Sequence, residues 1–313
     1  MERYNKSREE ILSTADNVNG ACMVVLEDDM LTVKEEPVHI FPYESDFGGH
    51  EFFEASSMRK VGDKYYFIYS SQKNHELCYA VSDRPDGGFR FMGTLVSNGD
   101  IGVNGVTEET RMNMTGTTHG SIICINGQWY VFYHRLTHKS DYSRQACAEK
   151  IYLSEDGTFA QAEMTSCGLN DAPLTGKGSY PAVIACNITN GKMPHGSNKI
   201  FTDSFPNVNH RINKETGKTE RCICEISDGT LIGYRYFRFE SLSEMTVTYS
   251  GDCKGVFEVC TSPSGEPGAE IQLSPSAHWT EASAKLSLPD GDYPLFLRYK
   301  GTGTAALLTL SFN

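Results

Sequence analysis

The sequence predicts an all-β protein: a partial β-propeller of about two and a half to three blades, followed by a β-sandwich of the jelly-roll type. Two observations predict this fold. Residues 54–69 recur as residues 118–133, 64 positions later, and a strand–turn–strand unit repeated at long period is typical of propellers. From residue 222 to the end, strand-like runs separated by turn residues recur every 8–12 residues, which is typical of a sandwich.

The repeated segment defines two blades. In the first we expect a hairpin over 57–68 with its turn at Gly62-Asp63, and strands at 77–81 and 89–96, while a further strand at 21–26 precedes this blade. The second repeats the order in strands at 121–125, 129–134 and 144–151, followed by a turn at 155–157. Four short antiparallel strands separated by turn residues form a propeller blade.

The count of blades falls short of a ring. The strand at 21–26 fits the third strand of a blade whose first two strands are missing, whereas a closed propeller needs at least four blades. The chain therefore looks N-terminally incomplete. We expect a polar segment at 1–20, the partial propeller at 21–168, and a linker with the sandwich at 169–313, where strands are predicted at 231–239, 245–249, 255–261, 270–273, 284–288, 293–299 and 305–312.

Composition narrows the function. The 313 residues carry a formal net charge of −12, which argues against nucleic-acid binding and is compatible with a neutral substrate such as a sugar. No apolar run reaches membrane-spanning length, and no signal peptide opens the chain. The ten cysteines include no Cys-x2-Cys pair, which argues against a zinc site. We interpret them as reduced thiols of a cytoplasmic protein, with secretion left open because the N-terminus looks incomplete.

Glu54 is the first candidate for catalysis. It follows two phenylalanines and precedes three small residues, and an apolar collar would raise its pKa as a general acid requires. A salt-bridged or sheet-edge glutamate is the alternative, and Glu51 is the local competitor. His119 stands at the same strand end in the second repeat, where it could bind a metal, contact substrate or be a buried structural histidine.

Arg144 and three aromatic residues complete the candidate set. Arg144 begins a strand, where its guanidinium could fork onto a carboxylate or sugar hydroxyls, or form a structural ion pair with Glu149. In the sandwich, Trp279, Tyr293 and Tyr299 could serve as sugar-stacking platforms, although each is more often a core residue.

At these residues the chain resembles glycoside hydrolase family 43. The resemblance rests on residues 53–57, 62–71, 76–80, 117–121, 127–134 and 143–149, and covers roughly residues 20–168. The C-terminal part is similar to a family 6 carbohydrate-binding module at residues 237–239, Trp279 and residues 291–301. The resemblance implies a five-bladed propeller and inverting hydrolysis of arabinofuranosides and xylosides in plant cell-wall polysaccharides such as arabinoxylan, xylan and arabinan.

The resemblance also implies roles for these residues. Glu54 would be the general acid, His119 the central histidine beside a bound Ca²⁺ or its water, and Arg144 a support for the catalytic carboxylates. The family also needs an aspartate base, and none of the four upstream aspartates, Asp16, Asp28, Asp29 and Asp46, has the expected Asp-Pro or Asp-Ala context.

The missing base leaves three hypotheses for function. We expect the chain to be catalytically weak or inactive as a fragment of a family 43 enzyme. The alternatives are a non-catalytic carbohydrate-binding protein and one half of a split enzyme that takes its missing blades from a partner chain.

Overall fold

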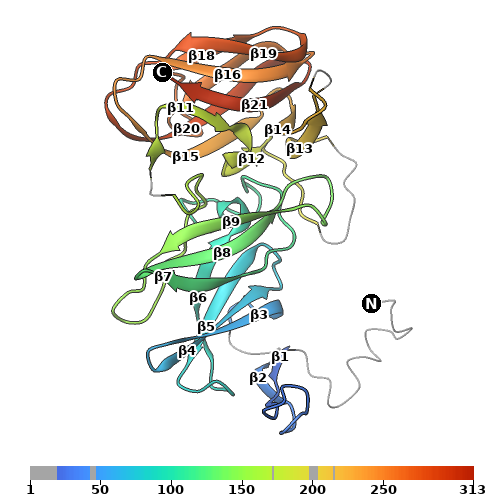
Figure 1. The fold of residues 1–313 in the computed structure, drawn as a ribbon, viewed down its shortest axis with the longest axis vertical. Helices are drawn as coiled ribbons and strands as arrows, with labels where there is room; N and C mark the ends of the chain where they lie inside the picture. Colours follow the sequence, from blue (N-terminus) through green and yellow to red (C-terminus); the bar gives the residue numbers. More distant parts are fainter. Residues whose placement is uncertain (1–19, 43–46, 171–172, 197–203, 214–215) are drawn as a thin grey trace, which may run out of the picture. The chain divides into compact units, whose positions relative to one another are not determined.

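The computed structural model describes residues 20–42, 47–170, 173–196, 204–213 and 216–313, whose regular elements are β-strands and two short 3-10 turns (Figure 1). The predicted all-β class is confirmed. These residues divide into two compact units. The first holds the chain to residue 95, with 118–133 and 151–161, and the second holds 96–117, 134–150 and 162–313. In the parts of the chain so described, no helix has the length and apolarity to cross a membrane.

A four-stranded sheet forms the centre of the first unit. It consists, in spatial order, of β3 (Phe52–Val61), β4 (Lys64–Ser71), β5 (Glu76–Ser82) and β6 (Arg90–Ser97). The turn between β3 and β4 lies at Gly62-Asp63 as predicted, and Gly62 adopts a φ of 59°, which glycine accepts without steric cost. Strands β4 and β5 are buried along nearly their whole length, because their apolar and aromatic residues pack on both faces.

The second repeat forms a sheet of three strands rather than four. These are β7 (Gly120–Ile125), β8 (Gln128–Leu136) and β9 (Arg144–Ile151), with the β7–β8 turn at Asn126-Gly127. The predicted turn at 155–157 is closed by an isolated bridge between Leu153 and Phe159. The Phe159 ring lies among the rings of Tyr66, Tyr79 and Trp129, so aromatic contacts inside the first unit hold this segment.

The strand predicted at 21–26 is shorter than expected and differently paired. Strand β1 (Gly20–Met23) pairs antiparallel with β2 (Val38–Pro42) in a two-stranded sheet, and β2 is its one strand partner within the described ranges. Ala21 and Ile40 nevertheless join the apolar cluster of Phe67, Tyr69 and Cys78. The predicted N-terminal segment at 1–20 lies, apart from Gly20, outside the described residues.

The second unit contains the predicted sandwich. One sheet is ordered β10-β15-β20-β17-β18 with β12 beside β15, and the other β13-β14-β21-β16-β19 with β11 beside β21. Their bounds are β10 Leu174–Thr175, β11 Gly178–Pro181, β12 Asn187–Thr189, β13 Asn207–Ile212, β14 Thr219–Ile226, β15 Leu231–Phe239, β16 Glu244–Gly251, β17 Lys254–Cys260, β18 Ala269–Leu273, β19 Ser276–Lys285, β20 Gly291–Thr302 and β21 Ala305–Phe312.

Both sheets bury apolar side chains in one core, which includes Phe237, Phe239 and Phe312 at close ring contacts. Two sequence expectations need correction here. The strand predicted at 284–288 begins at Ser276 and ends at Lys285, because its solvent-facing polar half carries little apolar signal. The stretch 166–222, expected to be irregular, contains β10 to β13 and part of β14.

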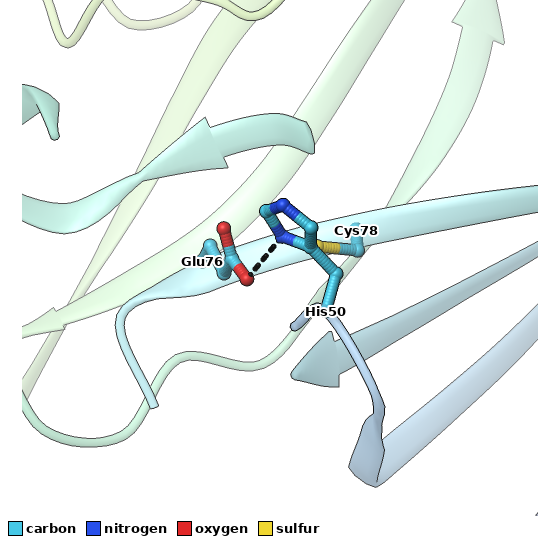
Figure 2. Close-up of side chains that lie close together, drawn as sticks. All are labelled: His50, Glu76 and Cys78. Carbon is cyan, nitrogen blue, oxygen red and sulfur yellow. Dashed lines mark hydrogen bonds and ion pairs between the residues drawn. The ribbon is translucent and has the colours of Figure 1, made fainter. Parts of the chain in front are cut away.

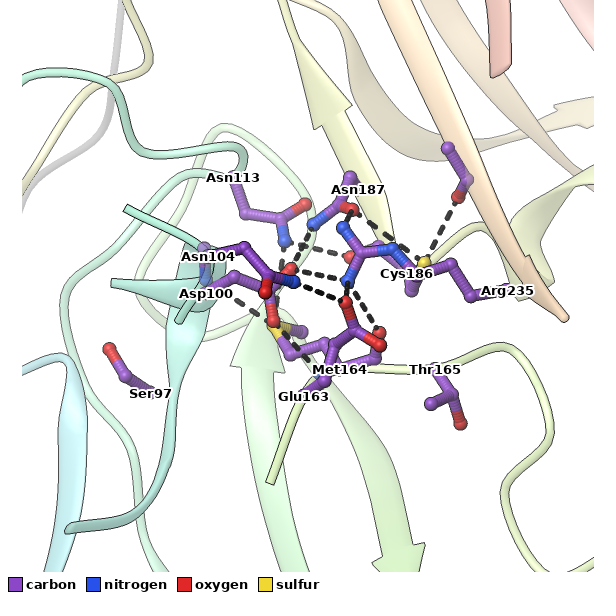
Figure 3. A network of polar contacts seen from close by, with 12 residues as sticks. Ser97, Asp100, Asn104, Asn113, Glu163, Met164, Thr165, Cys186, Asn187 and Arg235 are labelled. Carbon is purple, nitrogen blue, oxygen red and sulfur yellow. Dashed lines mark hydrogen bonds and ion pairs between the residues drawn. The ribbon is translucent and has the colours of Figure 1, made fainter. Parts of the chain in front are cut away.

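A buried ionic network anchors several segments of the second unit (Figure 3). Arg235 on β15 donates to Asp100 Oδ2 at 2.9 Å and to Asn187 Oδ1 at 2.5 Å, and it also pairs with Glu163 Oε1 at 3.0 Å. Moving residues 98–100 or 163–164 away from β15 would leave the buried Arg235 charge without a partner. Such a loss typically costs about 3–5 kcal/mol, so the network holds both segments against β15.

Candidate active site

Glu54 lies where strand β3 is irregular. The register between β3 and β4 shifts on both sides of Glu54, and the following residue, Ala55, has a φ of +62°. A left-handed backbone at a non-glycine residue costs on the order of 1 kcal/mol or more and needs surrounding structure to hold it. Such a bulge turns a side chain away from the regular alternation of the strand, and here it sets the direction of the Glu54 carboxyl.

His119 is positioned by a close approach of the backbone. It immediately precedes β7, whose first residue, Gly120, pairs with Tyr133. A Cβ atom added to Gly120 would lie 2.1 Å from the carbonyl oxygen of Phe132, so only glycine fits at this point. The absence of a side chain at residue 120 therefore lets β7 approach β8 with His119 at its entrance.

The two candidate side chains meet directly. The Nε2 atom of His119 lies 2.6 Å from Oε1 of Glu54, and their side chains are 36% and 44% exposed, respectively. At this distance Glu54 Oε1 can accept a hydrogen bond from His119 Nε2–H, which leaves the other carboxyl oxygen, Oε2, to carry a proton. The carboxyl is thus oriented by the histidine while remaining open to a ligand.

Three further contacts hold the two strand entrances together. Ser57 Oγ lies 2.8 Å from Ser121 Oγ, and these serines are equivalent positions of the sequence repeat. Arg59 Nε donates to the carbonyl oxygen of Ile122 at 3.0 Å, and the Ser70 hydroxyl donates to the carbonyl oxygen of Thr118, the residue before His119. The duplicated segments therefore pack against each other through their matching ends.

The apolar collar expected around Glu54 is not present in the described residues. Phe53 is 46% exposed, and Phe52 turns toward Phe67 and Tyr69 instead. Orientation by His119, rather than enclosure, distinguishes this carboxyl. Glu51, the local competitor, accepts from the backbone N–H of Gly49 at 3.2 Å within a tight turn, which is a structural contact.

Arg144 lies in the second unit and is exposed, and its Nε donates to the carbonyl oxygen of Asp141 at 3.1 Å. Its proposed partner Glu149 accepts from the Thr165 N–H at 2.8 Å and from the Thr165 hydroxyl at 2.6 Å. The role of Arg144 toward catalytic carboxylates stays a prediction.

A calcium ion beside His119 or its water stays a prediction, and His119 by itself does not supply the oxygen ligands that calcium prefers. Calcium takes six to eight oxygen ligands, whereas His119 offers a nitrogen that already faces Glu54. Over the described ranges, one group of three His, Cys, Asp or Glu side chains lies close enough to share an ion, and it does not include His119.

The sandwich candidates occupy different environments. Trp279 on β19 is half-buried and lines a hollow of about 280 Å³ together with Arg211, Ser250 and His278. The Arg211 guanidinium lies 6.0 Å from the centre of the Trp279 ring, a cation–π contact that sequence reasoning missed because the two residues are 68 positions apart. Tyr293 packs against the core.

The expectation that Tyr299 could stack on a sugar is wrong. Tyr299 has no exposed surface, and its hydroxyl donates to the Thr302 carbonyl oxygen at 2.7 Å. A sugar cannot stack on an inaccessible ring. The residue lies on an inward-facing position of β20, where strand alternation places large aromatic side chains in the core.

Comparison with known proteins gives a consistent result for the first half of the chain. Residues 5–159 match the sequence profile of glycosyl hydrolases family 43. A xylosidase/arabinosidase of Thermoclostridium stercorarium is 45% identical over 302 residues, which are 92% of this chain and 63% of that protein. A beta-xylosidase of Xylanibacter ruminicola is 40% identical over 92 residues, 29% of this chain and 24% of that protein.

Among solved structures, a family 43 arabinoxylan arabinofuranohydrolase from Bacillus subtilis in complex with cellotetraose is similar at 17% identity and a TM-score of 0.45, covering 93% of this chain and 58% of that one. This chain spans less than two thirds of the length of each of these relatives.

Proposed function

We propose that this chain, which belongs over residues 5–159 to glycosyl hydrolases family 43, contributes the general acid of an inverting glycoside hydrolase acting on terminal arabinofuranosyl or xylosyl residues of plant hemicellulose. The observation that carries the proposal is the 2.6 Å contact of Glu54 with His119 inside the family segment. The substrate class is inferred from the relative that is 45% identical, which is named a xylosidase/arabinosidase.

The proposed chemistry uses Glu54 as proton donor. A protonated Glu54 transfers its proton to the glycosidic oxygen as the bond to the sugar breaks, and the alcohol leaves. The carboxylate so formed is then stabilised by a hydrogen bond from His119 Nε2–H. In an inverting reaction a water attacks from the opposite face of the sugar, activated by a second carboxylate roughly 6.5–9.5 Å from the first.

We also propose that the second carboxylate is not among the described residues. Asp29, one upstream aspartate, accepts hydrogen bonds from the Leu31 and Thr32 backbone N–H groups and from the Thr32 hydroxyl, which is a turn-capping arrangement. Asp28 lies in the same exposed turn, and Asp16 and Asp46 lie outside the described residues. Turnover by this chain is therefore expected to be slow.

Hydrolysis of short arabinoxylan and xylan oligosaccharides by the purified chain tests the proposal. Glu54→Gln should lower kcat/KM by about 10²–10⁴-fold, the usual contribution of general acid catalysis. Glu51→Gln, three residues away, is the matched control and should retain activity. Small anions such as azide should accelerate the wild-type chain, because they can attack the sugar where the base would activate water. Equal activity in Glu54→Gln and Glu51→Gln would contradict the proposal.

A second function is favoured by the hollow at Trp279. Its half-buried ring beside Arg211 offers an apolar face and hydrogen-bond donors, the combination that binds sugars. Under this alternative the chain binds carbohydrate through the sandwich without hydrolysing it. Retention on xylan during affinity electrophoresis should then fall in Trp279→Ala and remain in Tyr293→Phe, and unchanged retention in Trp279→Ala would exclude the hollow.

A further inference from the structure

A second cluster of chemically active side chains lies in the first unit and shares no residue with the Glu54–His119 contact (Figure 2). It consists of His50 from the segment before β3, with Glu76 and Cys78 from β5. His50 Nδ1 lies 2.7 Å from Glu76 Oε1 and 3.9 Å from Cys78 Sγ. One potential ligand atom from each residue lies within 4.8 Å of the others, the one such group of three His, Cys, Asp or Glu side chains in the described part of the chain.

The geometry points to a site for a divalent transition metal ion of the zinc type, and we propose that His50, Glu76 and Cys78 bind it as three protein ligands. An imidazole nitrogen, a carboxylate oxygen and a thiolate sulfur are the three donor types that zinc accepts. Magnesium and calcium, which prefer oxygen ligands alone, do not suit this set. The sequence lacks a Cys-x2-Cys pair, which argues against a cysteine-rich zinc site, but zinc also binds mixed sets of nitrogen, oxygen and sulfur ligands.

The distances are close to those of a tetrahedral ion. With zinc bonds of about 2.0–2.3 Å, the nitrogen and oxygen would lie about 3.3 Å apart and the nitrogen and sulfur about 3.6 Å apart. The observed separations of 2.7 Å and 3.9 Å differ from these by less than about 1 Å. The carboxylate oxygen and the sulfur lie within 4.8 Å of each other.

Neighbouring side chains hold Glu76 and His50 in place, as is usual for metal ligands. Glu76 is 3% exposed and accepts hydrogen bonds from the Ser71 hydroxyl at 2.5 Å and the Thr94 hydroxyl at 3.2 Å. The His50 ring stacks on Phe91 with centres 4.7 Å apart. Such outer contacts fix the carboxylate and the ring plane, and in metal sites their loss typically weakens affinity about 10–100-fold.

The position of His50 indicates how a metal ion would reach the site and how its binding would affect the first unit. Its side chain is 24% exposed, whereas Glu76 and Cys78 are buried, so an ion would enter from the histidine side with its fourth position toward solvent. Because His50 stands four residues before Glu54, a bound ion would fasten the entry of β3 to β5 and stabilise the first unit. Binding to the folded state alone raises the unfolding temperature by mass action.

Cobalt spectroscopy on the full chain tests the site, since Co²⁺ bound to a thiolate gives a charge-transfer absorption that Zn²⁺ abolishes. After treatment with a chelator, the wild-type chain should bind one equivalent of Co²⁺ with this absorption, and one equivalent of Zn²⁺ should displace it. Cys78→Ser should lose the absorption, and His50→Gln should weaken Zn²⁺ binding at least tenfold. Circular dichroism checks that both variants fold.

Cys22→Ser provides the matched control, because Cys22 Sγ also lies near a histidine, 3.5 Å from His39 Nδ1, but without a carboxylate in the group. It should retain the absorption. The proposal is overturned if wild type shows no thiolate absorption, if the absorption persists in Cys78→Ser, or if Cys22→Ser abolishes it. If Cys78→Ser does not fold, His50→Gln still tests the proposal. An unchanged Zn²⁺ affinity in His50→Gln would also contradict the proposed site.

Discussion

His119 Nε2 lies 2.6 Å from Glu54 Oε1, joining the corresponding ends of two strands that the sequence repeats 64 residues apart. The contact depends on two backbone features: the left-handed conformation of Ala55 after the carboxylate, and the close approach permitted by Gly120 after the histidine. Each feature belongs to one copy of the repeat. The two copies of the repeat are therefore not equivalent, since one carries the carboxylate and the other carries the histidine that contacts it.

Replacing His119 by phenylalanine should lower kcat/KM for arabinosyl or xylosyl substrates by about 10–100-fold, because the acid loses its orienting partner. Asparagine at the same position can still donate a hydrogen bond and should restore part of the activity. Steady-state kinetics of the two variants, with His39→Asn as control, measures the effect. Equal rates for His119→Phe and wild type would show that the contact does not position the acid.

Ala55→Gly should stabilise the protein by about 0.5–1 kcal/mol, because glycine adopts a positive φ without the steric cost that alanine bears. Ala80→Gly in the regular, buried part of β5 is the control and should destabilise by a similar amount. Chemical denaturation followed by circular dichroism compares them. A loss of stability in Ala55→Gly would mean that the bulge is not strained.

Gly120→Ala should destabilise the first unit by about 1–3 kcal/mol, because the added methyl group would lie 2.1 Å from the Phe132 carbonyl oxygen. The strand must shift to relieve this contact, and His119 should shift with it, so activity should fall as well. Gly127→Asn, at a turn with open space around it, should have a much smaller effect. The unfolding temperatures of Gly120→Ala and Gly127→Asn measure this difference. A similar drop in both would mean that the close approach at Gly120 is not the cause.

Glu258→Gln should reduce the loss of sandwich stability on acidification. Burial alone would raise the pKa of Glu258, but hydrogen bonds from Lys300 and Arg298, both at 2.6 Å, outweigh it and lower the pKa below 4.5. A carboxyl with a lowered folded-state pKa stabilises fully above its unfolded pKa, and this contribution is lost as pH falls through the folded value.

Unfolding temperatures at pH 7 and at successive steps below pH 4.5 measure this contribution of Glu258. The wild-type chain should lose more stability over that interval than Glu258→Gln. Parallel curves for the two proteins would show that the ion pair does not contribute to acid sensitivity.

Local sequence signals identified much of this structure. The turn at Gly62-Asp63 and the strands around it were predictable because turn residues and apolar runs act over a few positions. The repeat also predicted that Glu54 and His119 stand at equivalent strand ends. The short strands β10 to β13 escaped prediction because their pairing partners, such as β15, β21 and β14, supply the order that their own polar sequence lacks.

Other features depend on contacts between distant residues and leave no local signal. The positive φ of Ala55 occurs at a residue type that gives no indication of it. The grouping of His50 with Glu76 and Cys78 requires the strand order of the first sheet. Tyr299 remained a candidate sugar platform, with a core position as the alternative, because aromatic content alone does not tell which face of a strand is buried.

The central claim is that Glu54 is the proton donor. The most direct test is how strongly the loss of rate in Glu54→Gln depends on the leaving group of the substrate. A general acid matters little when the departing group is already a stable anion and greatly when it must be protonated. We predict that Glu54→Gln loses about 10²-fold or more on a xyloside with a poor leaving group but less than tenfold on a nitrophenyl xyloside, measured on one preparation with azide present. An equal loss on both substrates, or none on either, would contradict the assignment of Glu54 as the proton donor.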